Sequence, residues 1–129
     1  MGRIRSKNTK PERVVRSLLH RMGYRFRLHR QDLPGTPDIV LPRYRAAILV
    51  HGCYWHRHAG CKYAYTPKSR ADFWQKKFDE NVARDRRDRC ALKHLGWRVL
   101  VVWECETQDH PKLARRLHRF LSALGEAQQ

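Results

Sequence analysis

The segment between residues 51 and 61 constrains the fold more than any other part of the chain, because it gathers side chains that bind soft metals. Its cysteines and histidines are His51, Cys53, His56, His58 and Cys61. Thiolate and imidazole ligands together favour zinc, which binds four such groups tetrahedrally. A closed zinc site would staple a domain of 129 residues, whose hydrophobic core is small.

The spacing within this segment leaves the third zinc ligand open. Cys53 and Cys61 lie eight positions apart, so an irregular loop must bring the two thiols together. Gly60 permits the tight return that such a loop needs. His56 and His58 both have spacings from Cys53 that suit a ligand, and the spacing does not choose between them.

The fourth zinc ligand must come from elsewhere in the chain, and the two candidates are Cys90 and Cys105. Cys90 falls inside an expected helix, whereas Cys105 follows an apolar segment where one loop can approach another. We therefore favour Cys105. The alternative is a set of free cysteines with unrelated histidines, and a disulfide is disfavoured in a cytosolic protein.

The charge of the chain favours a polyanionic partner. There are 28 Lys and Arg residues, most of them arginine, against 12 Asp and Glu residues, which gives a net charge of +16. The planar guanidinium group matches phosphate oxygens, but charge alone does not choose between DNA, RNA and an anionic membrane surface. No apolar run approaches the roughly 20 residues of a membrane span, and no signal peptide opens the chain. We expect a cytoplasmic protein without a membrane partner.

The pattern of helices and strands predicts one domain over residues 1–129, with loose residues at 1–8. Thr9 and Glu12 form a capping box that begins the first helix, which ends at Gly23. The remaining predicted elements are a strand over Tyr24–Leu28, a hairpin of Asp38–Leu41 and Ala46–Val50, a helix over Arg70–Leu95 capped by Ser69, a strand over Trp97–Trp103, and a helix over His110–Leu124 within the C-terminal segment 107–129. This order predicts an α/β fold with a mixed sheet flanked by helices.

Three carboxylates stand out because acids are few in this basic chain. Asp38 opens a strand that lies beside a second strand ending at Val50-His51, where it could hold Mg²⁺ with a backbone carbonyl. A simple turn-forming Asp is the alternative. The capping box fully explains Glu12. Asp85 shares a helical stripe with apolar residues, so it needs a partner, which is either an ion pair or a histidine that it orients.

Two further groups of residues suit contact with nucleic acid. Tyr54 and Trp55 are adjacent aromatic residues in an irregular basic loop, where they could stack on bases or wedge between them. The arginines of the long helix that could meet phosphates are Arg84, Arg86, Arg87 and Arg89. The alternative is that these arginines contact no phosphate and only form a solvated face of the helix.

Several motifs together carry a resemblance to a known family. They are Lys10-Pro11-Glu12, Leu33-Pro34-Gly35 with Pro37-Asp38-Ile39-Val40, Val50-His51-Gly52-Cys53-Tyr54-Trp55-His56-Arg57-His58, Phe73-Trp74, Asn81 with Arg84-Asp85-Arg86-Arg87, and Gly96-Trp97-Arg98-Val99 with Val102-Trp103-Glu104-Cys105. Over residues 1 to about 106 the chain resembles the very short patch repair (Vsr) DNA mismatch endonucleases.

The resemblance implies a fold similar to the type II restriction endonucleases and a structural zinc. It also implies a Mg²⁺-dependent nick of one strand beside the T of a T:G mismatch. The zinc ligands implied by the resemblance are Cys53, His58, Cys61 and Cys105. The partner would be double-stranded DNA with a T:G mismatch, bound by a monomer in the bacterial cytoplasm near the nucleoid, with other mismatch-repair proteins as further partners.

The resemblance also implies catalytic roles. Asp38 would hold Mg²⁺ with help from the Val50 carbonyl. His56, which zinc leaves free, would act as the general base, and His51 would assist at the scissile phosphate. The restriction-type (E/D)xK pattern is absent, because the second strand ends in Val50-His51, so histidines take the place of its lysine.

The supporting roles implied by the resemblance fall on four more residues. Asp85 would orient a histidine and Glu12 would support the site, while Tyr54 and Trp55 would form the wedge beside the mismatch. Two other functions stay open at this point. One is a nicking nuclease of the same fold with a different DNA target, and the other is a non-catalytic, zinc-stapled DNA-binding module.

Overall fold

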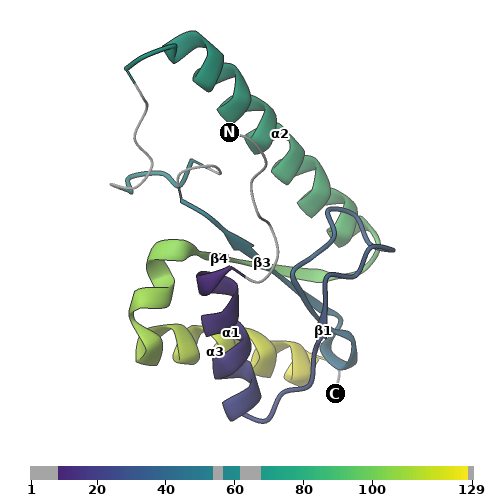
Figure 1. The fold of residues 1–129 in the computed structure, drawn as a ribbon. Helices are drawn as coiled ribbons and strands as arrows, with labels where there is room; N and C mark the ends of the chain where they lie inside the picture. The colour runs from purple at the N-terminus through teal and green to yellow at the C-terminus, as the bar shows by residue number, and fades with distance from the viewer. Residues whose placement is uncertain (1–8, 54–56, 62–67, 128–129) are drawn as a thin grey trace.

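The computed structural model describes residues 9–53, 57–61 and 68–127. In Figure 1 they form a four-stranded sheet with helices on both faces. The elements in chain order are α1 (Lys10–Arg21), β1 (Arg27–Leu28), β2 (Ile39–Leu41), the short 3-10 helix η1 (Pro42–Tyr44), β3 (Ala46–His51), α2 (Ala71–His94), β4 (Arg98–Trp103), the 3-10 helix η2 (Glu104–Gln108) and α3 (His110–Ala127). The predicted order of helices and strands is confirmed.

The sheet is mixed, as predicted, and its strands follow the order β1-β2-β3-β4. The first three strands are antiparallel, and β2 with β3 forms the predicted hairpin in which Ile39 pairs with Ile48. Strand β4 runs parallel to β3 over its full length, up to the pair of His51 and Trp103. Because these two strands end together, the segments that follow them begin side by side.

Alternating side chains give the sheet two apolar faces. Ile39, Ile48 and Val102 belong to a core shared with α1 and α3. Val40 and Ala47 point to the opposite face, where they belong to a second cluster with Leu92 of α2 and other buried residues. Figure 1 shows this division, with α1 and α3 together on one side of the sheet and α2 on the other.

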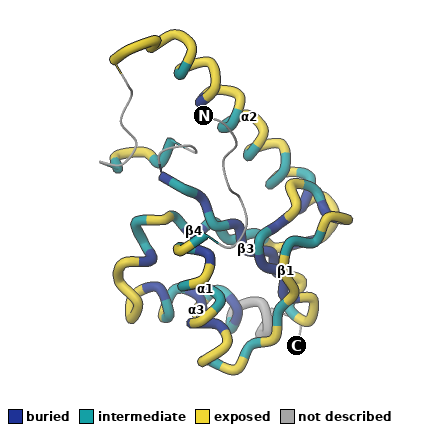
Figure 2. The backbone as a smooth tube through the Cα atoms, in the orientation of Figure 1, coloured by how far each residue is buried: buried dark blue, intermediate teal, exposed yellow. Residues whose placement is uncertain are grey.

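Helix α2 is long but contributes little to the core. It spans 24 residues, of which only Phe78 and Leu92 are buried. Figure 2 shows most of its length exposed. The prediction that Ser69 caps this helix is wrong: the cap position is Arg70, whose left-handed backbone (φ +56°) turns the chain into the helix without a side-chain cap.

The C-terminal helix begins later than the start of the segment 107–129 in which it was expected. Residues Glu104–Gln108 form η2, and α3 starts at His110. Pro111 stands at the second position of α3 and lacks the N–H group that would continue a helix from η2. Among the helices of the described residues, none is both long and apolar enough to cross a membrane.

Candidate metal centre and carboxylate site

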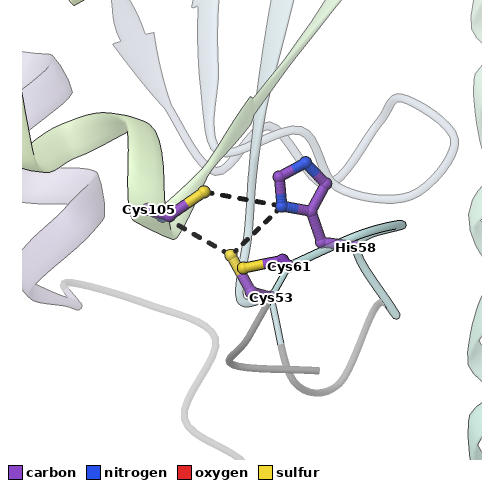
Figure 3. A group of neighbouring side chains, drawn as sticks. All are labelled: Cys53, His58, Cys61 and Cys105. Atoms are coloured by element: carbon purple, nitrogen blue, oxygen red, sulfur yellow. Dashed lines mark hydrogen bonds between the residues drawn. The ribbon is translucent and has the colours of Figure 1, made fainter. Parts of the chain in front are cut away.

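Three cysteines and one histidine converge beyond the ends of β3 and β4. The Sγ atoms of Cys53, Cys61 and Cys105 and a ring nitrogen of His58 all lie within 4.8 Å of one another. The His58 Nδ1 atom is 3.6 Å from the Cys53 Sγ atom and 3.5 Å from the Cys105 Sγ atom. Figure 3 shows the four side chains directed toward a common centre.

The backbone between Cys53 and Cys61 folds back on itself as the spacing requires. The His58 N–H donates to the Cys53 carbonyl at 3.1 Å, and the Cys61 N–H donates to the His58 carbonyl at 3.2 Å. Gly60 has a φ of +72°, the left-handed conformation expected of a tight return. The Arg57 guanidinium lies 4.0 Å from the centroid of the Phe78 ring, which ties this loop to α2.

Cys105 joins the cluster because β3 and β4 are parallel. It lies in η2 directly after β4, and its N–H donates to the Cys53 Sγ atom at 3.4 Å. Cys90, the other candidate, is exposed on α2 and is not among the clustered ligands. The structure therefore brings together the four residues that the resemblance implied.

The donor set fits a closed site for a soft divalent metal. Burial above all, together with the neighbouring thiols of Cys105 and Cys61, raises the pKa of the Cys53 thiol to about 12. Burial also raises the pKa of Cys105. Thiols that hold their protons this firmly are poor nucleophiles, because attack requires the thiolate. A metal displaces these protons, and three sulfurs with one nitrogen make a common four-ligand zinc set.

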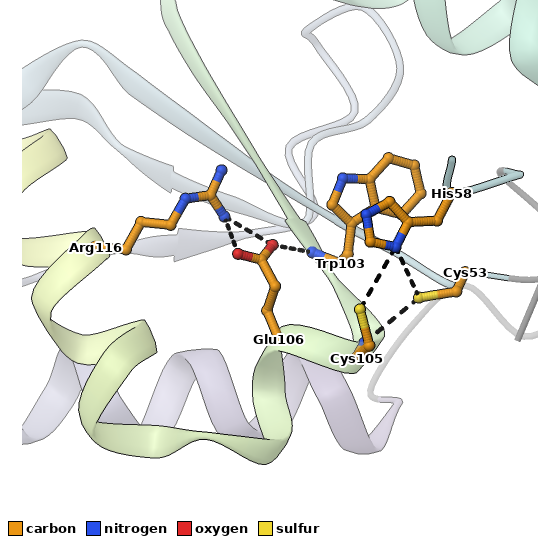
Figure 4. Close-up of polar contacts among 6 residues, drawn as sticks. All are labelled: Cys53, His58, Trp103, Cys105, Glu106 and Arg116. Carbon is orange, nitrogen blue, oxygen red and sulfur yellow. Dashed lines mark hydrogen bonds and ion pairs between the residues drawn. The ribbon is translucent and has the colours of Figure 1, made fainter. Parts of the chain in front are cut away.

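Polar and aromatic contacts outside the cluster hold its ligands in place. The Glu104 Oε1 atom accepts the Cys53 N–H at 3.4 Å. The Glu106 Oε1 atom accepts the backbone N–H of Trp103 at 2.8 Å, and both Glu106 oxygens lie 2.7 Å from Arg116 Nη1. Figure 4 shows the contacts of Glu106 with Trp103 and Arg116, and the Trp103 indole against the His58 ring.

Four residues that contact the site were not predicted from the sequence: Trp103, Glu104, Glu106 and Arg116. The signal for the first two was present in the segment Trp103-Glu104-Cys105, which is part of the family resemblance. Arg116 lies ten residues beyond Glu106, on α3, and no sequence pattern connects them.

A second group of potential ligands lies at the start of β2. Ligand atoms of Glu12, His29 and Asp38 all lie within 4.8 Å of one another. The Asp38 Oδ2 atom accepts the Val50 N–H at 2.8 Å, so the carboxylate is fixed to the neighbouring strand. His29 was not singled out in the sequence, because it belongs to no motif and only the fold brings it to Glu12.

The Glu12 side chain makes contacts beyond the start of α1. Thr9 Oγ1 accepts the Glu12 N–H at 3.4 Å, which confirms the predicted start of the helix. The Glu12 side chain is only 1% exposed, and its Oε2 atom contacts His29 Nε2 at 2.8 Å and Arg16 Nη1 at 3.4 Å. Among the described residues, the buried Oε1 atom has no hydrogen-bond partner. The capping box alone therefore does not account for this carboxylate.

The loop before β2 is pressed against α2. Gly35 has a φ of +74°, and a Cβ atom at this position would lie 2.8 Å from the Asp88 Cβ atom. Burial raises the pKa of Asp88, and the neighbouring Asp85 carboxylate raises it further. This contact explains why the loop needs a glycine at this position.

The remaining predicted residues are placed only in part. His51 is buried at the end of β3, where its ring meets Trp103 edge-on at 5.2 Å. Asp85 is half-buried on α2, and the exposed arginines of α2 are Arg84, Arg86 and Arg87. Tyr54, Trp55 and His56 lie outside the described residues.

Known proteins similar to this chain are nicking enzymes and mismatch endonucleases. Residues 1–62 match the family model of DNA mismatch endonuclease Vsr. The type II nicking enzyme V.XorIIP of Xanthomonas oryzae is 58% identical over 121 residues, which cover 94% of this chain and 88% of that enzyme. DNA mismatch endonuclease Vsr of Escherichia coli is 41% identical over 134 residues, covering 100% of this chain and 85% of that protein.

A solved structure gives the same picture of the fold. The catalytic domain of homing endonuclease I-Bth0305I matches with a TM-score of 0.65 and 25% identity, covering 91% of this chain and 98% of that domain. The mixed sheet flanked by helices is thus the predicted restriction-endonuclease-like fold, and the protein is a DNA endonuclease. The chain belongs to the Vsr family of DNA mismatch endonucleases.

Proposed function

We propose that this endonuclease nicks one strand of double-stranded DNA beside the T of a T:G mismatch, with Mg²⁺ as the catalytic ion and zinc as a structural one. The observation that carries the proposal is the bond between the Asp38 carboxylate and the Val50 N–H. It fixes a carboxylate at the end of β3, on the residue that directly precedes His51.

Asp38 and the Val50 carbonyl would hold the Mg²⁺ ion. In an extended strand the N–H and C=O of one residue point to the same side, so the Val50 carbonyl faces the side on which its N–H reaches Asp38. Two oxygens of this kind suit Mg²⁺, which keeps several waters and takes further oxygens from phosphate. When bound, the ion would neutralise charge that develops on the scissile phosphate.

The histidines would move protons at the attacked phosphate. We assign the general base to His56 and a phosphate contact to His51, which is 6% exposed at the end of β3. A histidine suits the base because its ordinary pKa of about 6.5 lets it take a proton at neutral pH. Asp85, half-buried on α2, would orient a histidine, and Glu12 would support the site from α1.

The basic surface would grip the duplex. The net charge is +16, and the exposed Arg84, Arg86 and Arg87 lie on the long α2 helix. We assign the mismatch wedge to Tyr54 and Trp55, because aromatic side chains can enter a base step and unstack it. The enzyme would act as a monomer in the bacterial cytoplasm near the nucleoid, with other mismatch-repair proteins as further partners.

The structural ion would be zinc. Three sulfurs and one nitrogen within 4.8 Å form a closed set with no position left for substrate. The set would stabilise the fold by joining the ends of β3 and β4 to the loop at His58.

A nicking assay on matched duplexes tests the function. The substrates are T:G, T:A, C:G and other single mismatches in one sequence, each with and without Mg²⁺, with each strand labelled separately. We expect one cut beside the mismatched T, only with the ion. Equal cutting of paired duplex would indicate a nicking nuclease with another target. Binding without cutting under all conditions would indicate a non-catalytic DNA-binding module.

A further inference from the structure

His29 makes two bonds that join different parts of the carboxylate site. Its backbone N–H donates to the Asp38 carbonyl at 3.1 Å, which extends the β1–β2 pairing by one residue. Its side-chain Nε2 atom lies 2.8 Å from the Glu12 Oε2 atom, at hydrogen-bond distance. One residue therefore links the helix that carries Glu12 to the strand that begins after Asp38.

The backbone of His29 is held in an unusual conformation. Its φ is +48°, in the left-handed region that a residue with a side chain rarely occupies. The neighbouring strand β1 has only two residues, so regular sheet structure ends directly before His29. The bond to Asp38 holds the turn, and the turn directs the imidazole toward α1. Such conformations persist where the surroundings determine them, and they are concentrated at functional sites.

The bond from His29 has a different role from the other contact of Glu12. Arg16 reaches the same Oε2 atom at 3.4 Å, but it lies four residues along the same helix. The Arg16 cation balances the Glu12 charge within α1, but this ion pair does not connect the helix to the sheet. Because Glu12 is 1% exposed, its orientation depends on the few groups that contact it, and His29 is the contact that comes from the sheet side.

We propose that His29 is a positioning residue that holds the Glu12 carboxylate beside Asp38. The proposal rests on the nicking function proposed above. An ionised carboxylate only accepts hydrogen bonds, so Nε2 donates its proton to Glu12. This nitrogen is then used by the hydrogen bond and is not available for another partner. His29 consequently acts through Glu12 and fixes the distance between the two carboxylates before DNA binds. Groups that orient the residues of a metal site in this way typically contribute a factor of about 10 to 100 in activity.

The test compares His29→Gln with His29→Leu. The glutamine amide nitrogen can donate to Glu12 in place of Nε2, whereas leucine fills space without donating. We expect the leucine variant to lower the single-turnover nicking rate by about 10- to 100-fold, and the glutamine variant to recover most of it. DNA affinity, metal content and melting temperature should stay unchanged in both. His20→Gln and His20→Leu are the matched controls, since His20 is an exposed histidine of α1.

The test is repeated in an enzyme that already carries Glu12→Gln, so that it gives an answer even if His29→Leu weakens folding. There the bond from His29 no longer reaches a carboxylate, so His29→Leu should add little further loss of rate. Losses that multiply would overturn the proposal, as would a His29→Leu enzyme that nicks at the wild-type rate. If His29→Gln is as slow as leucine and needs more Mg²⁺ for half-saturation, the ring is a metal ligand and the positioning role is wrong. Wild-type enzyme that fails to nick T:G duplex refutes the proposed function instead.

Discussion

The His58 ring lies flat against the Trp103 indole, with ring centroids 4.2 Å apart and planes 9° from parallel. The same indole receives His51 edge-on at 5.2 Å and 77°. Trp103 therefore separates a residue of the metal cluster from a residue assigned to the scissile phosphate. A rigid aromatic spacer of this kind fixes two imidazoles relative to each other without bonding to either ring.

We expect Trp103→Leu to lower both the melting temperature and the nicking rate. Aromatic pairs contribute about 0.5–1.5 kcal/mol each beyond the area they bury, and leucine removes two such contacts. Trp103→Phe keeps a flat ring and should retain more of both. Phe73→Leu is the control, because Phe73 is exposed and its ring meets its neighbour Trp74 and the Arg70 guanidinium, away from Trp103. Thermal denaturation and single-turnover nicking measure the effects, and a Trp103→Leu enzyme equal to wild type in both would contradict this role.

Metal removal should loosen the whole domain, since energy of binding to a structural site is folding energy. Purified protein should contain about one zinc per chain. Cys105→Ser should lose the metal and melt at a lower temperature, whereas Cys90→Ser, which alters an exposed thiol, should keep both properties. Metal analysis and thermal denaturation with and without a chelator provide the measurements. Full zinc content in Cys105→Ser would show that the ligand set is wrong.

Glu106 should matter more than its ion-pair partner. Arg116→Ala removes an ion pair whose side chains are 40% and 29% exposed, and such pairs contribute only about 0–1 kcal/mol. Glu106→Ala also leaves the backbone N–H of Trp103 without its acceptor. Removing the partner of a buried donor lowers the free energy of unfolding by about 1–3 kcal/mol. Chemical denaturation of the two variants gives the difference. Equal losses of unfolding free energy would mean that the bond to Trp103 contributes nothing.

The sequence predicted the elements of this fold well because local chemistry determines them. Thr9 at the start of α1 and Gly60 in the metal loop act through the backbone within a few residues. The cap of α2 was mispredicted because Arg70 adopts a left-handed conformation that residue type disfavours. No local rule selects such a residue, since the surrounding structure imposes the conformation.

The site was most predictable where its ligands lie close together in the sequence. Cys53, His58 and Cys61 are close in sequence, and one further thiol completed the cluster. The contact between His29 and Glu12 spans 17 residues and joins a loop to a helix, so periodicity gives no sign of it. The role of Glu12 was missed for a different reason. The predicted capping box gave a complete local explanation for this carboxylate, although His29, which follows β1, also contacts it.

DNA binding should be strongly salt-dependent, and mismatch preference should depend on Trp55. Each phosphate neutralised by this chain of net charge +16 releases counterions, so affinity should fall steeply as salt rises. Trp55→Ala should reduce the preference for T:G over paired duplex more than it reduces overall binding, because a wedge acts at the weakened base step. Trp97→Phe, at a buried residue packed with α2, is the control. Unchanged discrimination in Trp55→Ala would contradict the wedge.

Asp38→Asn and His56→Ala should each abolish most nicking while DNA binding and zinc content persist. Asparagine keeps an oxygen for the Val50 N–H, so the strand geometry survives, but it removes the charge that would hold Mg²⁺. Loss of a general base typically lowers the rate by about 10² to 10⁴, which is the loss expected for His56→Ala. Asp79→Asn is the matched control, because Asp79 is an exposed carboxylate on α2 that bonds only to Gln75 among the contacts described. Single-turnover nicking at saturating enzyme separates chemistry from binding. Full activity in Asp38→Asn would refute the metal site, whereas full activity in His56→Ala would transfer the base to His51, whose buried position at the end of β3 lies one residue beyond Val50.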